Sequence, residues 1–188
     1  MNIYVDCGSF IGQTVRSFMQ WAGPDLSKWE IHAFEANPNI VAQYPPEVKF
    51  QPVAAWTREG FIDFYVSERN PCVDGASLLS SKRTGHLDLK HPLRVRCIDF
   101  PAWSLNLFES PDIANTDRAI LKMNVEGAEY NILPAMLSNG SLACFDDLYL
   151  EAHCEKIGMP EAESAALLAK VRQVVNLHTM RDFYETFK

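Results

Sequence analysis

Residues 6–12, Asp-Cys-Gly-Ser-Phe-Ile-Gly, combine an acidic residue with two glycines where an apolar segment gives way to helical spacing. Ile3 to Val5 are predicted to form a short buried strand, and apolar residues recur at helical spacing from Gly12 to about Ala22. A strand that turns through glycine into a helix directs free backbone N–H groups at whatever lies over the turn. The stretch therefore predicts a ligand-binding loop, although an ordinary structural turn would have the same pattern.

The residue types in this loop favour a cationic nucleoside over a phosphate-bearing cofactor. The dinucleotide-binding pattern G-x-G-x-x-G has a glycine where pyrophosphate meets the backbone, and Phe10 occupies that position here. The carboxylate of Asp6 would repel a pyrophosphate and attract an ammonium. S-adenosylmethionine carries an ammonium, a sulfonium and a ribose diol but no phosphate, so we expect it to fit better than NAD or ATP.

A second acidic residue, Glu35, lies at a spacing typical of nucleotide-binding α/β proteins. It ends the predicted strand 29–35 and follows Gly12 by 23 positions (35 − 12). In such folds an acid about 20 residues beyond the glycine loop accepts hydrogen bonds from ribose hydroxyls. Together with the glycine loop, Glu35 is predicted to be a ribose ligand rather than an ordinary surface acid.

The elements that must position these residues alternate as in a doubly wound α/β sheet. Strands are predicted at 3–5, 29–35, 48–56, 119–124 and 148–151, and helices at 12–22, 41–44, 101–108, 128–139 and 160–174. Pro134 is expected to kink its helix or split it after Leu133, and 183–187 is predicted to be a closing strand. We expect one domain, 1–188, with a Rossmann-like, mostly parallel sheet.

The region around 57–98 is predicted to be an inserted, hairpin-like extension of the sheet. A turn is expected at 57–60, and the alternating segments 61–66 and 93–98 flank the polar, irregular segment 67–91. A loop of that length is usually functional or disordered, so we interpret it as a lid that carries Ser77, Ser80 and Ser81. Seven basic residues gather in its second half and beyond: Lys82, Arg83, His86, Lys90, His91, Arg94 and Arg96. They form either a solvated basic face or a site for an anionic acceptor.

Composition excludes several classes of protein. The 188 residues are 47% hydrophobic and 22% charged, as in globular proteins. The net charge of −7 argues against binding to nucleic acid through phosphate neutralisation. The five cysteines include no C-x-x-C pair, which favours free thiols in a reducing compartment over disulfides or a zinc site. With no apolar run of membrane length and a first strand that starts at residue 3, we expect a cytoplasmic protein without a membrane partner.

Polar groups follow five of the predicted strands, at Asp6–Ser9, Glu35–Asn37, Ala54–Trp56, Asn124–Glu126 and Glu151–His153. Ligands of open α/β sheets lie across the carboxyl ends of the parallel strands. We therefore expect these five groups to form one site.

Three blocks of the sequence, V-D-C-G-S-F-I-G-Q-T at 5–14, F-E-A-N-P at 34–38 and L-K-M-N-V-E-G-A-E-Y at 121–130, resemble the FkbM-type methyltransferases. The similarity extends to V-A-A-W at 53–56 and L-E-A-H at 150–153, and K-x-x-V-E-G-A-E is its most specific part. The resemblance implies a class I methyltransferase fold and an S-adenosylmethionine-dependent enzyme that typically O-methylates sugars or secondary metabolites. Asn124 stands where the family usually has aspartate, which removes a charge from the end of its strand.

The expected site has a cofactor part and an acceptor part. The cofactor part comprises Asp6, Gly8, Ser9, Phe10, Gly12, Thr14, Glu35, Ala36, Ala54 and Asn124. Asn124, Glu126 and His153 are expected to face the acceptor, a carbohydrate or other small molecule, and no metal is expected. His153 and Glu126 are candidate general bases. Each also has a structural alternative, His153 packing under the last helices and Glu126 capping the helix that follows it, and Glu129 is open between a surface acid and a site residue.

Two other functions remain open. The chain could be a binding module that keeps the fold and S-adenosylmethionine but has lost turnover, an alternative favoured by Asn124. It could also be an enzyme that binds an ordinary dinucleotide, which Phe10 argues against. The sequence does not identify the acceptor, nor the oligomeric state.

Overall fold

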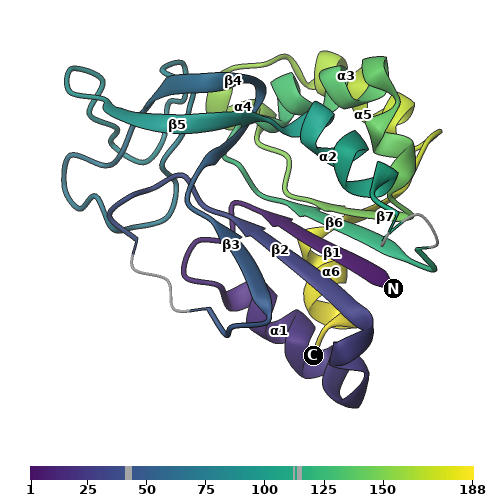
Figure 1. Cartoon of the computed structure of the whole chain (residues 1–188). Helices are drawn as coiled ribbons and strands as arrows, with labels where there is room; N and C mark the ends of the chain where they lie inside the picture. The colour runs from purple at the N-terminus through teal and green to yellow at the C-terminus, as the bar shows by residue number, and fades with distance from the viewer. Residues whose placement is uncertain (41–43, 112, 114–115) are drawn as a thin grey trace.

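Six parallel strands form the central sheet of the computed structural model, which describes residues 1–40, 44–111, 113 and 116–188 (Figure 1). In the described residues the strand order is β3-β2-β1-β6-β7-β8, and every neighbouring pair is parallel. The strands are β1 (Asn2–Cys7), β2 (Trp29–Phe34), β3 (Val48–Gln51), β6 (Ala119–Met123), β7 (Asp147–Leu150) and β8 (Asn176–Thr179). The order reverses between β1 and β6, which makes that junction the expected ligand position of a doubly wound sheet. The predicted Rossmann-like α/β fold is confirmed.

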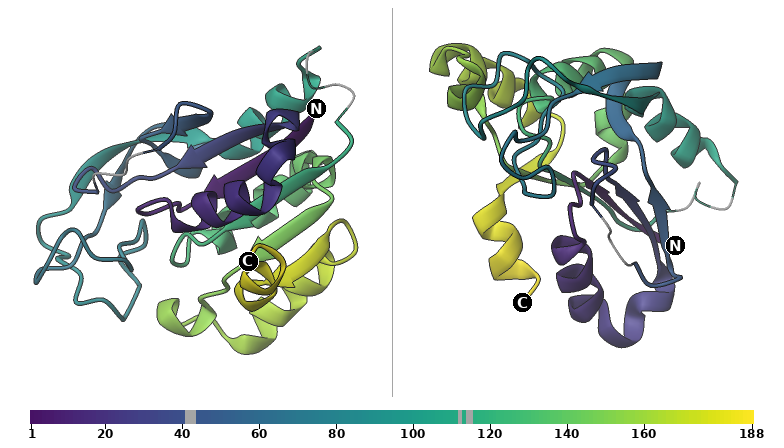
Figure 2. Two further views of the ribbon diagram at one scale, coloured as in Figure 1. Left: turned by 90° about the horizontal axis from the view of Figure 1, so that it is seen from below. Right: turned by 90° about the vertical axis from the view of Figure 1, so that its left-hand side faces the viewer.

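Helices cover both faces of this sheet (Figures 1 and 2). On one face α1 (Gln13–Ala22), the 3₁₀ helix η1 (Gly23–Lys28) and α6 (Met180–Thr186) pack around Tyr4, whose ring stacks on Phe18 at 3.9 Å. On the other face α2 (Phe100–Glu109), α3 (Glu129–Asn139), the 3₁₀ helix η2 (Ser141–Cys144) and α5 (Glu161–Val171) pack around Ile3 and Val5. Alternate residues of β1 thus enter opposite cores, as the twofold side-chain repeat of a strand requires.

The insertion forms a sheet of its own, so the prediction that it extends the parallel sheet is wrong. β4 (Ala54–Phe64) and β5 (Leu93–Asp99) pair antiparallel with each other and lie near α2 and α3 (Figure 1). The prediction of one strand over 48–56 is wrong, because the chain leaves the parallel sheet at Pro52, which has no N–H to continue a ladder. The predicted turn at 57–60 is also wrong: β4 continues through it, and the pairing register shifts between Ala54 and Gly60.

Three other predictions concern single segments. Residues 183–187 are not a strand: Phe183 lies in α6, which begins at a capping box between Thr179 and Asp182, and Phe183 and Phe187 bury the same helical face. α3 runs unbroken through Pro134, because Ile132, Leu133 and Met136 are fully buried and packing outweighs the lost hydrogen bond. The predicted helix at 41–44 lies almost wholly outside the described residues.

The segment 67–91 is described throughout and contains no helix or strand, only isolated bridges from Tyr65 to Ser77 and from Ser67 to Leu87. A short helix that the sequence did not predict, α4 (Cys154–Ile157), follows β7. Within the described part of the chain, none of the helices combines the length and the apolar character needed to cross a membrane.

Candidate functional site

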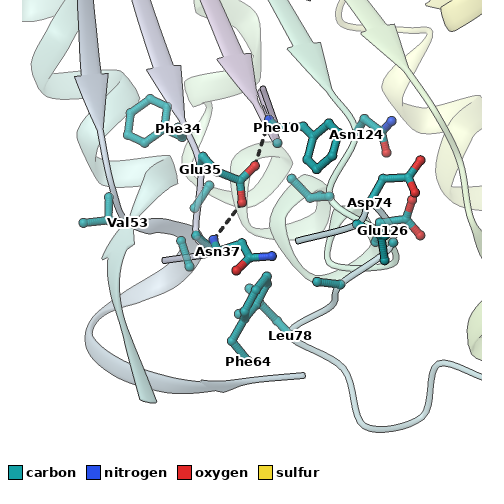
Figure 3. Close-up of a pocket in the computed structure, with 18 residues that line it drawn as sticks. Phe10, Phe34, Glu35, Asn37, Val53, Phe64, Asp74, Leu78, Asn124 and Glu126 are labelled. Carbon is teal, nitrogen blue, oxygen red and sulfur yellow. Dashed lines mark hydrogen bonds between the residues drawn. The ribbon is translucent and has the colours of Figure 1, made fainter. Parts of the chain in front are cut away.

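A cavity lies at the carboxyl ends of β1, β2 and β6, where the strand order reverses (Figure 3). It holds about 660 Å³ of space free of protein atoms, some of it open to solvent. Its walls come from five parts of the chain: residues 8 and 10, 34–37, 53–55 with 64, 73–76 with 78, and 124–126. Four of the five predicted strand-end groups therefore meet here, and the inserted segment adds a wall.

The glycine loop is held against the ends of β2 and β6. Gly8 has φ +77°, and a Cβ there would lie 1.8 Å from the carbonyl oxygen of Asn124, so no larger residue fits. The N–H groups of Gly8 and Ser9 both donate to the carbonyl of Phe34 at 3.0 Å. Phe10, with φ +49°, lines the cavity at the position where a dinucleotide site would have a glycine.

Glu35 follows β2 directly and lines the cavity. Its Oε2 accepts the Phe10 N–H at 2.8 Å and its Oε1 accepts the Asn37 N–H at 2.7 Å (Figure 3). Burial raises the pKa of this carboxyl, and the two backbone hydrogen bonds oppose that rise. The carboxylate is therefore fixed in place, and each oxygen keeps acceptor capacity for a further donor such as a ribose hydroxyl.

Asp6 does not face the cavity, contrary to the expectation that its carboxylate attracts an ammonium there. It is the fifth residue of β1, is fully buried, and forms an ion pair with Lys122 at 2.8 Å. Thr14 Oγ1 and the Tyr4 hydroxyl also donate to it. The charge of Asp6 is thus already balanced inside the protein.

Three other predicted cofactor residues support the loop and do not line the cavity. Ser9 Oγ donates to the Phe34 carbonyl at 3.1 Å and lies 2.6 Å from the Tyr44 hydroxyl. Gly12, with φ +79°, precedes α1, and Thr14 holds α1 to β1 through Asp6. The remaining predicted cofactor residues, Gly8, Phe10, Glu35, Ala36, Ala54 and Asn124, all line the cavity.

Asn124 and Glu126, which follow β6, form the wall opposite Phe34. Asn124 Nδ2 donates to Glu151 Oε2 at 2.7 Å, which orients the amide, while its Oδ1 is buried without a hydrogen-bond partner in the described residues. Glu126 has φ +54°, a rare backbone conformation for a residue with a side chain.

The charge of Glu126 is compensated by two lysines. Its carboxylate lies 2.8 Å from Lys82 Nζ and 3.1 Å from Lys156 Nζ. Burial acts to raise the pKa of Glu126, but the hydrogen bond from Lys82 and the nearby positive charges outweigh burial and lower it. Glu126 is therefore firmly ionised near neutral pH.

His153 is buried and does not line the cavity, although it was expected to face the acceptor. Its backbone N–H donates to Glu129 Oε1 at 2.8 Å, and its ring Nδ1 lies 3.0 Å from the same oxygen. The other oxygen of Glu129, Oε2, accepts the backbone N–H of Gly127 at 2.8 Å. Glu129 is therefore a buried anchor between the turns after β6 and β7, not a surface acid. His153 Nε2 lies 3.5 Å from Glu126 Oε1 and 3.5 Å from Glu151 Oε1, so these two carboxylates separate the histidine from the cavity.

The sequence reasoning missed the contribution of residues 73–76 and 78, and of Phe64, to the cavity wall. The available signal was the length and polarity of the 67–91 segment, which indicated a functional loop but not which of its residues meet the strand ends. Among the described residues, no group of three or more histidine, cysteine, aspartate or glutamate side chains is arranged to hold a metal ion.

Comparison with known families gives one match. The family model described as the methyltransferase FkbM domain matches residues 6–176. No curated protein and no solved structure matches the chain.

Proposed function

This chain belongs to the methyltransferase FkbM domain family, and we propose that it uses S-adenosylmethionine to methylate a hydroxyl oxygen of a carbohydrate or other small metabolite. One observation carries the choice of cofactor. The charged side chains that line the cavity among the described residues are Glu35, Asp74 and Glu126, all of them acidic. Two lysines compensate Glu126, so the remaining negative charge of the cavity comes from Glu35 and Asp74. A cavity with this charge favours a cationic nucleoside and disfavours a phosphate-bearing one.

The rest of the cavity fits the same ligand. Phe10 leaves no bare backbone for a pyrophosphate, and Glu35 is held where it can accept hydrogen bonds from a ribose diol. Val53, Phe64 and Leu78 give the apolar surface that an adenine ring needs. The buried Oδ1 of Asn124 is an acceptor without a donor, which a ligand N–H or O–H would satisfy.

When bound, S-adenosylmethionine supplies a methyl group already activated by its sulfonium. The task left to the protein is to hold the acceptor oxygen in line with that methyl group and to exclude water, which contributes on the order of several kcal/mol. Removing the hydroxyl proton adds about 10²–10⁴-fold. We assign this step to Glu126, which lines the cavity. His153 supports this step through its contact with Glu126 and does not itself reach the acceptor.

Calorimetry with S-adenosylmethionine, S-adenosylhomocysteine and NAD tests the cofactor assignment. We expect saturable binding of the first two and none of NAD. Incubation with a labelled methyl donor and a panel of neutral and acidic sugars and small alcohols then tests transfer to oxygen. Binding of NAD alone, or of none of the three ligands, would contradict the proposal.

A non-catalytic binding module is the second candidate. Two observations favour it: Asn124 carries no charge at the end of β6, and His153 is buried away from the cavity. Tight binding of both adenosyl ligands without methyl transfer to any acceptor of the panel would support this candidate over the enzyme.

A further inference from the structure

We propose that Asp74, from the inserted segment, binds the ammonium of the amino-acid part of S-adenosylmethionine, the role that the sequence had suggested for Asp6. The inference rests on the proposed function and extends it, because it makes the insertion part of the cofactor site.

Of the three carboxylates on the cavity wall, only that of Asp74 is without compensation in the described residues. Glu126 lies 2.8 Å from Lys82 and 3.1 Å from Lys156. Glu35 accepts two backbone N–H groups. The Asp74 side chain, by contrast, makes no ion pair and no hydrogen bond with any part of the chain that the structure describes, although Asp74 lines the cavity. A cation entering the cavity therefore meets its least satisfied negative charge at Asp74.

The position of Asp74 is fixed by its neighbours, although the residue itself is exposed. Ser77 Oγ donates to the carbonyl of Glu126 at 2.8 Å, and Lys82 Nζ bonds both the Gly75 carbonyl and the Glu126 carboxylate. Both contacts attach the segment around Asp74 to the turn after β6. An exposed acid on an unattached loop would have no reason to stay at the cavity, whereas this one is held there.

The location also suits the shape of the ligand. Asp74, Asn124 and Glu126 lie together on one side of the cavity, and Phe34 and Val53 lie on the other (Figure 3). In S-adenosylmethionine the ammonium and the ribose are separated by the chain that carries the sulfonium. With the ribose at Glu35, the ammonium is free to reach Asp74, where the unpartnered Asn124 Oδ1 offers a second acceptor.

The test is calorimetry of the wild type and Asp74→Asn with three ligands. S-adenosylmethionine has the ammonium and the sulfonium, S-adenosylhomocysteine has the ammonium only, and 5′-methylthioadenosine has neither. We expect the substitution to weaken the first two by about tenfold, the effect of one charge-assisted hydrogen bond at a partly exposed site, and to leave the third unchanged. Glu68→Gln, which removes an exposed acid of the same segment outside the cavity wall, is the matched control and should change none.

Three results would overturn the inference. Unchanged affinities would make Asp74 a solvated surface acid. Loss for S-adenosylmethionine alone would assign it to the sulfonium, and equal loss for all three ligands would assign it to the nucleoside or to the shape of the loop. If the wild type bound none of the three, the proposed function itself would fail, which is a different result from an unaltered Asp74→Asn variant.

Discussion

Lys122 Nζ lies 2.8 Å from Asp6 Oδ1 and donates to the Gly8 carbonyl at 2.7 Å. The two residues are opposite each other in the β1–β6 register, so their side chains leave the sheet on the same face. Both side chains are almost fully buried: the exposed fraction is 3% for Lys122 and 0% for Asp6. Lys122, the lysine of the K-x-x-V-E-G-A-E block, thus holds the glycine loop in place through the Gly8 carbonyl. Asp6 is the counter-ion of this lysine rather than a residue that binds the ligand.

Lys122→Met should destabilise the fold strongly, because it leaves the ionised Asp6 carboxylate buried and unpaired. Loss of one partner of a buried pair costs about 3–5 kcal/mol, measurable by urea unfolding at pH 7. Adding Asp6→Asn to this variant should recover part of the loss. Lys28→Met, which breaks an exposed pair with Asp25, should change little. If Lys122→Met and Lys28→Met changed the free energy of unfolding equally, the buried pair would stabilise the fold no more than the exposed one.

Gly8→Ala and Gly140→Ala separate packing from backbone strain. Both glycines have φ near +80°, but a Cβ at Gly140 meets nothing within 4 Å, whereas at Gly8 it collides with the Asn124 carbonyl. The substitution at Gly140 should cost about 1–2 kcal/mol for its left-handed backbone. The one at Gly8 should cost about 1–3 kcal/mol more and also weaken adenosyl ligand binding. Similar free energies of unfolding for the two variants would contradict the close contact.

Glu35 should make the ligand-free protein less stable as pH rises. Burial raises the pKa of Glu35 in the folded protein above its ordinary value of 4.5. Between pH 4.5 and this raised pKa, the folded protein therefore binds more protons than the unfolded chain. The free energy of unfolding of the wild type minus that of Glu35→Gln should therefore fall as pH increases from about 4.5 and level off above the folded pKa. Urea unfolding of both proteins from pH 4 to 8 measures this difference in the free energy of unfolding. A difference that does not change with pH would contradict the prediction.

Glu126 should have the opposite effect. Burial is outweighed by Lys82 and the other positive charges, so the folded pKa of Glu126 lies below 4.5. Its stabilising contribution is present above pH 4.5 and is lost as pH falls through the folded pKa. Relative to Glu126→Gln, the wild type should therefore lose stability on acidification below about pH 4.5. A gain on acidification would mean that the lysines do not compensate Glu126.

His153 and Glu126 should act as one catalytic unit. His153 does not line the cavity but contacts Glu126, which does, so removing either side chain should lower kcat by about 10²–10⁴-fold. The double variant His153→Ala/Glu126→Gln should be no worse than the poorer single one. The affinity of His153→Ala for S-adenosylmethionine, measured by calorimetry, should change little, because His153 does not line the cavity. An unchanged kcat of His153→Ala across pH 6–9, or additive losses, would exclude this arrangement.

Local sequence patterns were enough to predict most elements of the central sheet and the position of the cavity. The apolar run, the glycines and the change to helical spacing at 3–22 are adjacent in the chain, so they identified β1, the loop and α1 without knowledge of their neighbours. The position of Glu35 at the end of β2 followed in the same way, as did Gly140 beyond α3, where φ is +83°. The alternation of strands and helices was enough to predict a doubly wound sheet with the cavity at its carboxyl edge.

Only the tertiary structure decided where individual charges point. Asp6 and Lys122 are 116 positions apart (122 − 6), and only the pairing of β1 with β6 shows that they neutralise each other. Glu129 and His153 are buried together because two turns meet, and Asp74 reaches the cavity because Ser77 and Lys82 bind the Glu126 turn. Sequence spacing identifies residue types at strand ends, but burial and ion pairing depend on distant partners, which no local pattern contains.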